Sequence, residues 1–515
     1  MYFTQSLHRA LQQHPERIAC IYAGRERTFA EFADRVARLA GGLRRLGVQS
    51  GDRVAMLALN SDRYLEYLAA VPWADGVLVP VNTRWSVAEI GHALRDCDAQ
   101  VLLIGDEFLS ILPELQASVP GIRRTIHVGD ENSGDVIDYE ELVAGSDPAP
   151  DARRGGDALA ALFYTGGTTG VAKGVMLSHA NLTVSALGCA AVGYWVTPGG
   201  RYLHSAPMFH LADLCLWMAH SLAGNTHVIV PKFEPADVLT AVSGHQVTDL
   251  FLVPAMIQML VDHPGVADYD LSSVRRFCYG ASPISEAVLQ RTMHLLPDVE
   301  LAQAYGMTEL SPVATLLGPD DHRGVAARLR SAGRAAPHSE VRIVDEVDNE
   351  VPPGTVGEIV CRGGHVMLGY WKQPAATAAA VRGGWMHTGD GGYMDEDGYL
   401  YVVDRIKDMI VSGGENVYSA EVENALSQHP AVAACAVIGV PDPTYGERVH
   451  AVVVTAPGAD VTAEALRAHT KGLIAGYKAP RSFEFMDALP QSGAGKVLKR
   501  ELRRRHWEAA PRDVS

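Results

Sequence analysis

The stretch YTGGTTGVAKG, from Tyr164 to Gly174, decides most about the fold of this chain. It holds four glycines, three threonines and one lysine directly after the apolar run 158–163. Glycine lets backbone amides approach a polyanion closely, while threonine hydroxyls and Lys173 add donors and a positive charge. The composition therefore predicts a phosphate-binding loop at the end of a buried strand.

Two better-known phosphate loops do not fit this stretch. No Lys-Ser or Lys-Thr pair follows a G-x-x-x-x-G pattern, and the spacing is not G-x-G-x-x-G. Gly174 leads into a second apolar run, 175–177, rather than directly into a helix. The alternative is a flexible glycine hairpin without a ligand, which leaves the threonines and the lysine unexplained.

Length and composition limit the classes of function. A chain of 515 residues exceeds what one hydrophobic core usually fills, so two or more domains are expected. The formal net charge of −16 argues against a nucleic-acid partner, which requires a broad basic face. If the ligand is anionic, the positive charge that binds it must be local.

The seven cysteines are far apart and form no C-x-x-C pair. This pattern predicts reduced thiols in a cytoplasmic protein and argues against a cysteine-based zinc site. The polar residues from Arg9 to His14 interrupt the N-terminus, so no signal peptide is expected. Uncharged apolar runs stay short of 18 residues, so no integral membrane segment is expected.

Strand and helix patterns alternate twice along the first two thirds of the chain. The predicted strands are 54–60, 77–81, 100–105, 249–253, 274–279 and 299–304, and the predicted helices are 62–76, 87–96, 254–262 and 283–296. Two βαβαβ runs predict two parallel sheets flanked by helices. Ligands of such sheets bind beyond the carboxyl ends of the strands.

Three polar or glycine-rich segments begin where predicted strands stop. They are YTGGTTG, YGASP at 279–283 and YGMTE at 305–309. We expect them to converge on one sheet edge and to form a site there.

The pattern changes near residue 340, where short alternating segments separated by Gly, Pro and Asp predict a small β-rich region. Beyond Asp404 follows a unit of about a hundred residues with predicted helices at 419–427 and 462–473 and strands at 432–439 and 449–455. The fold class is therefore α/β: a large N-terminal domain, 1–404, has two sheets flanked by helices and a small β-barrel-like region. A smaller α+β domain occupies 405–515, and the boundary lies at 404–407.

These motifs resemble, in order, those of the adenylate-forming (ANL) superfamily, which includes acyl-CoA synthetases, aryl-CoA ligases, firefly luciferase and non-ribosomal adenylation domains. The phosphate loop, APMFH at 206–210, YGASP, YGMTE, TGD at 388–390, DRIKDMIVSGGENVY at 404–418 and PQSGAGKVLKREL at 490–502 carry the likeness over nearly the whole chain. Gly166 replaces a common serine and Ala172 a common proline, so weaker ATP binding at most is expected.

The resemblance implies an acid–thiol ligase that uses ATP, Mg²⁺ and coenzyme A. A carboxylate attacks the α-phosphate of ATP, pyrophosphate leaves, and a mobile C-terminal lid then lets a thiol attack the acyl-adenylate. The acid is already ionised at neutral pH, so positive charge rather than a general base is needed.

The resemblance also implies roles for individual residues. The catalytic residues implied are Lys496, Glu309, Thr308 and His210. The implied ATP/AMP-binding residues are Thr165, Gly166, Gly167, Thr168, Thr169, Gly170, Lys173, Gly280, Ala281, Ser282, Tyr305, Gly306, Met307, Thr308, Asp390 and Arg405. The acyl pocket implied is His210, Leu214, Gly280 and Met307; the hinge and thiol path are Lys407, Gly413, Gly414 and Glu415; and the Mg²⁺ ligands are Thr168 and Glu309.

Several of these residues also have a purely structural interpretation. Lys496 heads a basic stretch that solvent could cover, and Asp390 stands in a sequence that also favours a turn. Tyr305 ends a predicted strand, and Leu214 has the spacing of a helix core. His210 is as readily a structural histidine as a gate.

The first expectation for the substrate is a medium- or long-chain fatty acid, and an aryl or cinnamate-like acid is the alternative. A second hypothesis sends the acyl group to the phosphopantetheine of a carrier protein in trans. A third is a nucleotide-binding regulator without catalysis, against which Glu309, Asp390, Arg405 and Lys496 together argue. The sequence leaves a homodimer open.

Overall fold

The computed structural model describes residues 1–131, 134, 136–165, 172–324, 326–412, 415–491 and 497–507. The chain divides into two compact units. The large unit comprises Met1–Ser282, Arg291–Val341 and Cys361–Met386. The C-terminal unit comprises Pro283–Gln290, Arg342–Val360 and His387–Ser515.

An eight-stranded sheet of the large unit carries the phosphate-loop hairpin. Its order is β19 (Gly369–Tyr370), β9 (Lys173–Ser178), β8 (Leu159–Thr165), β4 (Val77–Pro80), β3 (Arg53–Leu57), β5 (Val101–Ile104), β6 (Arg124–His127), β7 (Ile137–Asp138). The strands from β8 to β7 pair in parallel, while β9 pairs antiparallel with both β8 and β19.

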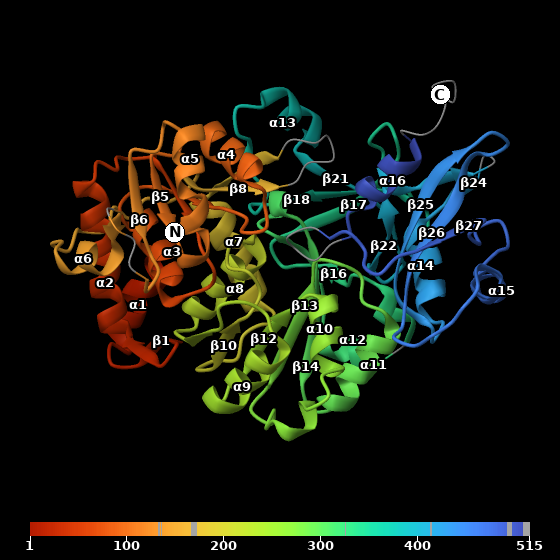
Figure 1. Ribbon diagram of the computed structural model, residues 1–515, viewed down its shortest axis with the longest axis horizontal. Coiled ribbons are helices and arrows are strands. Elements are labelled where there is room, and N and C mark those ends of the chain that lie inside the picture. Colours follow the sequence, from red (N-terminus) through yellow and green to blue (C-terminus); the bar gives the residue numbers. More distant parts are fainter. Residues whose placement is uncertain are drawn as a thin grey trace. The chain divides into compact units, whose positions relative to one another are not determined.

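A nine-stranded sheet carries the other two glycine-containing segments. Its order is β16 (Arg334–Ala335), β15 (Val313–Leu317), β14 (Glu300–Gly306), β13 (Arg276–Gly280), β12 (Asp249–Leu252), β10 (Arg201–His204), β11 (Thr226–Ile229), β1 (Ile18–Tyr22), β2 (Arg25–Thr28). In Figure 1 the green strands β12, β13 and β14 run side by side, with α10 and α12 next to them.

The helices before residue 400 are α1 (Gln5–Gln13), α2 (Phe29–Arg45), α3 (Asp62–Trp73), α4 (Val87–Asp96), α5 (Leu112–Ser118), α6 (Tyr139–Ala144), α7 (His179–Ala191), α8 (Leu211–Leu222), α9 (Pro235–His245), α10 (Pro254–Val261), α11 (Glu286–Leu295), α12 (Pro319–Arg323) and α13 (Pro374–Ala380). All of α3 is buried, charged residues included. Its Glu66 accepts hydrogen bonds from Arg35 and Tyr139, which compensate the burial of its charge.

A third sheet follows the order β17 (Glu340–Val344), β18 (Gly357–Arg362), β21 (Trp385–Met394), β20 (Val381–Arg382), with β22 (Leu400–Arg405) paired to β21. It corresponds to the predicted small β-rich region.

A fourth sheet forms the core of the C-terminal unit. Its order is β24 (Glu415–Val417), β23 (Ile410–Ser412), β26 (Gly446–Thr455), β25 (Val432–Asp442), with β27 (Ser482–Phe485) paired to β26. Alternate residues of β25 and β26 point to opposite faces. One face packs on α14 (Ser419–Ser427) and α15 (Ala463–Leu473), and the other on α16 (Lys499–Trp507).

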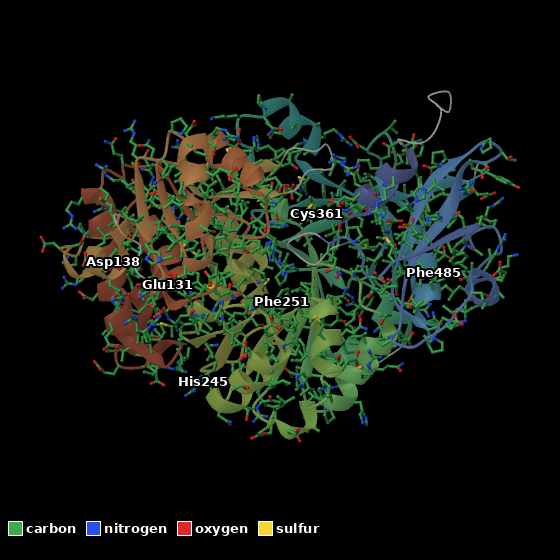
Figure 2. All side chains as sticks on the ribbon, viewed as in Figure 1. Glu131, Asp138, His245, Phe251, Cys361 and Phe485 are labelled. Atoms are coloured by element: carbon green, nitrogen blue, oxygen red, sulfur yellow. The ribbon has the colours of Figure 1, made fainter. Side chains whose placement is uncertain are left out.

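Figure 2 shows how densely side chains fill both units. Phe251 of β12 is 4% exposed and belongs to the core of the large unit. Phe485, at the end of β27, is 45% exposed.

The α/β class and both βαβαβ runs are confirmed. Helices α4 and α14 have the predicted bounds, and other boundaries differ by a few residues. The expectation of one shared sheet edge is wrong: the phosphate loop follows β8 of the eight-stranded sheet, whereas YGASP and YGMTE follow β13 and β14 of the nine-stranded sheet. The domain boundary at 404–407 stays a prediction.

Candidate active site

The two ends of the phosphate loop lie side by side in a hairpin. Thr165 ends β8, Lys173 begins β9, and the two residues are register partners. The residues between them, Gly166, Gly167, Thr168, Thr169, Gly170 and Val171, lie outside the described part of the chain. Tyr164 donates a hydrogen bond of 2.6 Å to Asp96 at the end of α4, which ties the hairpin to the neighbouring helix. Two paired antiparallel strands therefore flank the predicted phosphate loop, in agreement with the two apolar runs of the sequence.

Tyr370 connects this hairpin to the segment YGMTE. Its ring lies 5.0 Å from the ammonium nitrogen of Lys173, a cation–π distance. Its hydroxyl donates a hydrogen bond of 2.8 Å to Oε1 of Glu309. Burial, followed by the charge of Glu309, raises the pKa of Tyr370, so the phenol keeps its proton and remains a donor. A cation from one sheet and a carboxylate from the other therefore meet at one aromatic ring.

Glu309 is suited to an oxygen-preferring cation. It is 6% exposed and lies in the short 3₁₀ helix Thr308–Leu310 that follows β14. Its backbone carbonyl accepts a hydrogen bond of 2.9 Å from Met367, which fixes the turn. Mg²⁺ takes carboxylate and hydroxyl oxygens, so this carboxylate fits the ion. Thr168, the other predicted ligand, is among the residues left undescribed.

Close backbone approach explains the glycines of the two adenine-binding candidates. A Cβ on Gly280 would lie 2.4 Å from the carbonyl oxygen of Ala304 on the neighbouring strand, closer than real Cβ contacts allow. A Cβ on Gly306 would meet the carbonyl oxygen of Pro312. Ala281 has φ 68°, the left-handed region, where the chain turns away from β13.

The remaining adenine-binding candidates follow directly on these strand ends. Tyr305, Met307 and Thr308 are half-buried, as is Ser282. Strands β13 and β14 are parallel neighbours, so YGASP and YGMTE begin side by side at the same edge. This part of the predicted convergence is confirmed, although the phosphate loop comes from another sheet.

Helix α8 begins directly after His210. His210 is half-buried, and its ring centroid lies 4.3 Å from that of Phe209. Leu214 and Met218 on the same helix are 0% and 4% exposed. These residues form a packed apolar helix face, which suits both interpretations of Leu214: core residue and wall of an acyl pocket.

A buried hydrogen-bond chain fixes both ends of α8. Asp213, in the first turn, contacts His204 Nδ1 at 2.9 Å; His204 Nε2 contacts His227 Nδ1 at 2.9 Å; and His227 Nε2 contacts Ser221 Oγ, in the last turn, at 3.1 Å. Burial lowers the pKa of His227 well below its usual value, so this ring is neutral. Sequence reasoning missed the chain, because its members have no motif spacing.

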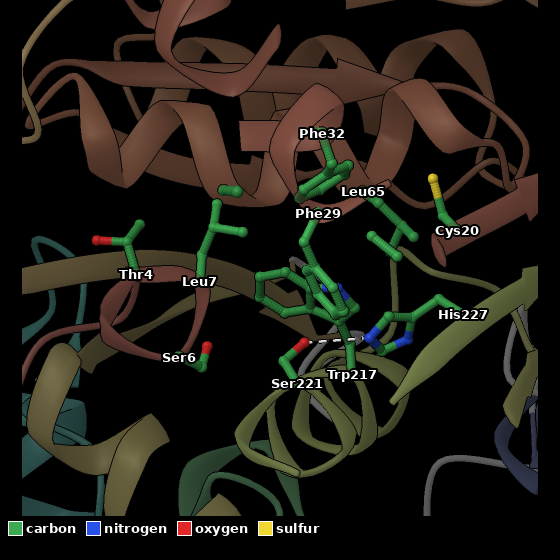
Figure 3. Close-up of a pocket in the computed structure, with 12 residues that line it drawn as sticks. Thr4, Ser6, Leu7, Cys20, Phe29, Phe32, Leu65, Trp217, Ser221 and His227 are labelled. Carbon is green, nitrogen blue, oxygen red and sulfur yellow. Dashed lines mark hydrogen bonds between the residues drawn. The ribbon is translucent and has the colours of Figure 1, made fainter. Parts of the chain in front are cut away.

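The last link of this chain borders a small cavity (Figure 3). Its volume is about 20 Å³, room for about one water molecule. Apolar side chains line most of it, and the dashed line in Figure 3 marks the bond between Ser221 and His227. The residues lining it are Thr4, Ser6, Leu7, Ala19, Cys20, Phe29, Phe32, Leu65, Ala69, Trp217, Ser221 and His227. The cavity is too small for an acyl chain, and its lining residues do not include those assigned above to the candidate site.

Asp390 and Arg405 are register partners on β21 and β22 in the C-terminal unit. Arg405 Nε lies 3.4 Å from Asp390 Oδ1. The backbone N–H of Asp390 donates to Thr388 Oγ1 at 3.1 Å, and Gly389 has φ 71°. Residues 388–390 therefore show turn chemistry and also present a carboxylate. The structural interpretation of TGD and the ribose-binding interpretation are compatible.

The predicted hinge segment is anchored on both sides. Asp404 accepts a hydrogen bond of 2.6 Å from the backbone N–H of Ser419 at the start of α14. Asp408 accepts one of 2.7 Å from Arg503 of α16. Lys407 lies between them in the 3₁₀ turn Ile406–Asp408.

The thiol-path and lysine candidates are described only in part. Glu415 begins β24 and is exposed. Gly413, Gly414 and Lys496, to which the resemblance assigns the thiol path and the catalytic lysine, lie outside the described residues.

Sequence comparison identifies the class of protein that this fold and these motifs define. A model of the AMP-binding enzyme family matches residues 7–371, and a model of the AMP-binding enzyme C-terminal domain matches residues 421–496. The chain belongs to this family and thus to the adenylate-forming superfamily, which confirms the resemblance. It is an acid–thiol ligase of the AMP-forming acyl-CoA synthetase type.

The relatives differ in the acid and in the acceptor that their names state. A feruloyl-CoA synthase of Amycolatopsis is 43% identical over 96% of this chain and 97% of its own. A fatty acid–[acyl-carrier-protein] ligase, ScoC of Streptomyces coeruleorubidus, is 36% identical over 99% of this chain and 97% of its own. The structure of the anthranilate CoA ligase AuaEII with anthranoyl-AMP matches with a TM-score of 0.91 at 25% identity, covering 98% of this chain and 97% of that one.

The described part of the chain has no helix long and apolar enough to cross a membrane.

Proposed function

We propose that the enzyme activates an aromatic acid of the cinnamate type as its acyl-adenylate and transfers the acyl group to coenzyme A. The observation that carries this is the 43% identity to feruloyl-CoA synthase over nearly the full length of both chains, against 36% to a fatty-acid ligase. An aryl or cinnamate-like acid, the alternative in the sequence analysis, is therefore preferred to the fatty acid that was expected first.

The architecture of α8 supports a planar substrate. The chain from Asp213 to Ser221 fixes both ends of this helix, and Leu214 is fully buried within it. A preformed wall suits a rigid ring, because such an acid loses little conformational freedom on binding. A long flexible acyl chain gains less binding free energy from a rigid wall, because the chain must lose conformational freedom to fit it.

In the first half-reaction a carboxylate oxygen of the acid forms a bond to the α-phosphorus, and the bond to pyrophosphate breaks. We assign Lys173 to the leaving phosphates and Lys496 to the charge that develops at the α-phosphate. Glu309, with Thr168, would hold Mg²⁺, which neutralises phosphate charge when bound. Tyr370 orients Glu309 through its hydroxyl and contacts Lys173 through its ring.

In the second half-reaction the thiol sulfur attacks the acyl carbon, and AMP leaves. We assign Tyr305 and the backbone at Gly280 to the adenine and Asp390 to the ribose hydroxyls. A rotation at Lys407 then removes Lys496 and admits the thiol past Glu415.

Pyrophosphate release with a panel of acids tests the proposal. Ferulate, 4-coumarate, cinnamate, indoleacetate, hexanoate and palmitate are each assayed with and without coenzyme A. A cinnamate-type acid is expected to exceed palmitate in kcat/KM by at least about 10-fold, the effect of ~1.4 kcal/mol. A preference for hexanoate or palmitate would refute the aromatic substrate while leaving the adenylation chemistry intact.

A second candidate acceptor is the phosphopantetheine of a carrier protein, which the similarity to ScoC favours. Thioester formation is therefore measured with coenzyme A and with a holo-carrier protein as competing acceptors. Rapid carrier loading with slow coenzyme A turnover would favour this acceptor. Pyrophosphate release that is independent of any acid would instead point to a protein without ligase activity.

A further inference from the structure

Two histidines and one glutamate meet on the α16 face of the C-terminal sheet. His450 comes from β26, Glu484 from β27 and His506 from the last turn of α16. Their nearest ligand atoms all lie within 4.8 Å of one another. Phe485, labelled in Figure 2, marks the end of the strand that carries Glu484. None of the three belongs to the candidate active site.

Both histidines present a nitrogen that the described residues leave unsatisfied. His450 is 4% exposed, and its Nε2 has no hydrogen-bond partner among these residues; the same holds for Nε2 of His506. The other ring nitrogen of His450, Nδ1, contacts Ser482 Oγ at 2.8 Å. In the tautomer with the proton on Nδ1, the ring donates to Ser482 and directs the lone pair of Nε2 towards the cluster. Metal-ligating histidines are held in this way.

The separations fit a four-coordinate ion better than direct hydrogen bonds. Oε2 of Glu484 lies 3.8 Å from Nε2 of His450 and 3.5 Å from Nε2 of His506. Both are too long for good N–H···O hydrogen bonds. A tetrahedral ion with bonds of about 2.1 Å places its ligand atoms about 3.4 Å apart. The two separations from Glu484 are thus within about 0.4 Å of this value, and the two histidine nitrogens lie within 4.8 Å of each other.

The surrounding charges leave this carboxylate oxygen and this imidazole available. Arg505 lies 3.6 Å from Oε1 of Glu484, the other carboxylate oxygen, so Oε2 faces the histidines. Nδ1 of His450 is engaged by Ser482, so Nε2 is the ring nitrogen that faces the cluster. The guanidinium of Arg448 donates to Ser482, and Asp442, 3.7 Å away, offsets its positive charge.

We propose that His450, Glu484 and His506 form a binding site for a borderline transition-metal ion, with Zn²⁺ as the probe and water as the fourth ligand. Two imidazoles and one carboxylate suit Zn²⁺ and Co²⁺, whereas Mg²⁺ prefers oxygen ligands alone. The ion joins α16 to β26 and β27. Glu484 and His506 flank the segment 490–502 in sequence, so the ion closes a loop that contains Lys496.

The test uses the full chain, stripped of metal by a chelator and kept in excess Mg²⁺. Titration with ZnCl₂ is followed by calorimetry, and titration with CoCl₂ by the visible ligand-field absorption of four-coordinate cobalt. One equivalent is expected to bind, and binding should raise the melting temperature of the protein.

His506→Ala and Glu484→Gln are the main variants, since both positions are partly exposed and should fold. Each should weaken Zn²⁺ binding by more than about 10-fold and abolish the cobalt absorption. His469→Ala is the matched control: His469 stacks edge-on against His429 in the same unit, and its Nε2 is already within 3.1 Å of the carbonyl of Ala425. Unchanged binding in His506→Ala, or an equal loss in His469→Ala, would overturn the site.

Discussion

Tyr370 shows most directly how single residues link separate motifs of this enzyme. Its ring contacts Lys173 and its hydroxyl contacts Glu309, residues of two motifs that sequence reasoning treats separately. The segment G-Y-W at 369–371 carries no recognised pattern, so only its pairing with β9 reveals the role. We infer that Tyr370 is a positioning residue for Glu309.

Tyr370→Phe should lower kcat/KM for ATP about 10- to 100-fold, since a hydrogen bond to a charged group contributes about 1.5–3 kcal/mol. Phenylalanine keeps the aromatic ring that contacts Lys173. The loss of kcat/KM therefore reports on the missing hydrogen bond to Glu309. Steady-state pyrophosphate release at varied Mg²⁺ measures the effect, and a raised Mg²⁺ requirement is expected. Tyr139→Phe is the control, because Tyr139 donates in the same way to Glu66 at 2.6 Å, at the ion-pair cluster around α3. An unchanged Mg²⁺ dependence in Tyr370→Phe would contradict the assignment.

Lys496→Ala should reduce pyrophosphate release by at least about 100-fold while barely changing ATP binding, because its ammonium group is needed only as charge develops. ATP affinity by calorimetry and pyrophosphate release under saturating acid separate the two effects. Lys471→Ala, an exposed lysine of α15, is the control. Near-normal release in Lys496→Ala would refute the catalytic role.

At the scale of elements, strand ends and one helix set the geometry of the candidate site. Strands β13 and β14 approach so closely at Gly280 that no side chain fits, and this brings YGASP and YGMTE together. Helix α8 is held by hydrogen bonds at its first and last turns. The site therefore depends on backbone spacing as much as on its polar side chains.

Gly280→Ala should destabilise the protein by about 1–3 kcal/mol, because the new Cβ would push β14 away. It should also raise KM for ATP, since the adenine-binding segments shift. Thermal melting and ATP titration measure the two effects. Gly244→Ala is the control: it lies in α9 with nothing within 4 Å of a new Cβ, and alanine favours a helix. Equal melting temperatures for wild type and Gly280→Ala would argue against this tight contact.

At the scale of the whole molecule, the proposed mechanism requires a different conformation of the C-terminal domain for each half-reaction. Lys407 lies between Asp404 and Asp408, which are held by α14 and α16 respectively. If the chain turns at Lys407, the contact from Asp404 to Ser419 must break while that from Asp408 to Arg503 persists.

Lys407→Pro should leave acid-dependent pyrophosphate release within about 3-fold of wild type, an effect below ~1 kcal/mol. It should block thioester formation, because proline fixes φ near −65° and restricts the rotation. Both half-reactions are measured on the same preparation. Lys372 is not a suitable position for a control proline, because its φ of 54° is incompatible with proline. Lys407→Ala therefore serves as the control, and an equal loss of both half-reactions in Lys407→Pro would count against a hinge.

The stability of the whole molecule should fall as pH drops below about 6.5. Burial lowers the pKa of a set of histidines in the folded state: His179, His220, His227, His322, His338, His365 and His450. As pH falls, these histidines take up protons in the unfolded chain at a higher pH than in the folded protein. Below its unfolded pKa, each therefore lowers the free energy of unfolding by up to about 1.4 kcal/mol per pH unit. Asp249, with a pKa raised to about 6 by burial, acts in the opposite sense, but the histidines outnumber such groups.

Melting temperatures from pH 7.5 to 5.0 at constant ionic strength check this expectation. The melting temperature should fall steadily below about pH 6.5. A flat profile across that range would show that the buried histidines do not control acid stability.

The sequence alone determined the class of protein, the order of its motifs and most of its elements. Apolar periodicity and glycine-rich strand ends are properties of neighbouring residues, so they can be recognised without the tertiary structure. Only the tertiary structure decided that the predicted phosphate loop follows one sheet while YGASP and YGMTE follow another, that Tyr370 joins Lys173 to Glu309, and that His450, Glu484 and His506 meet. Such contacts bring together residues far apart in the chain, and their distances follow from how sheets and helices pack, which no local pattern encodes.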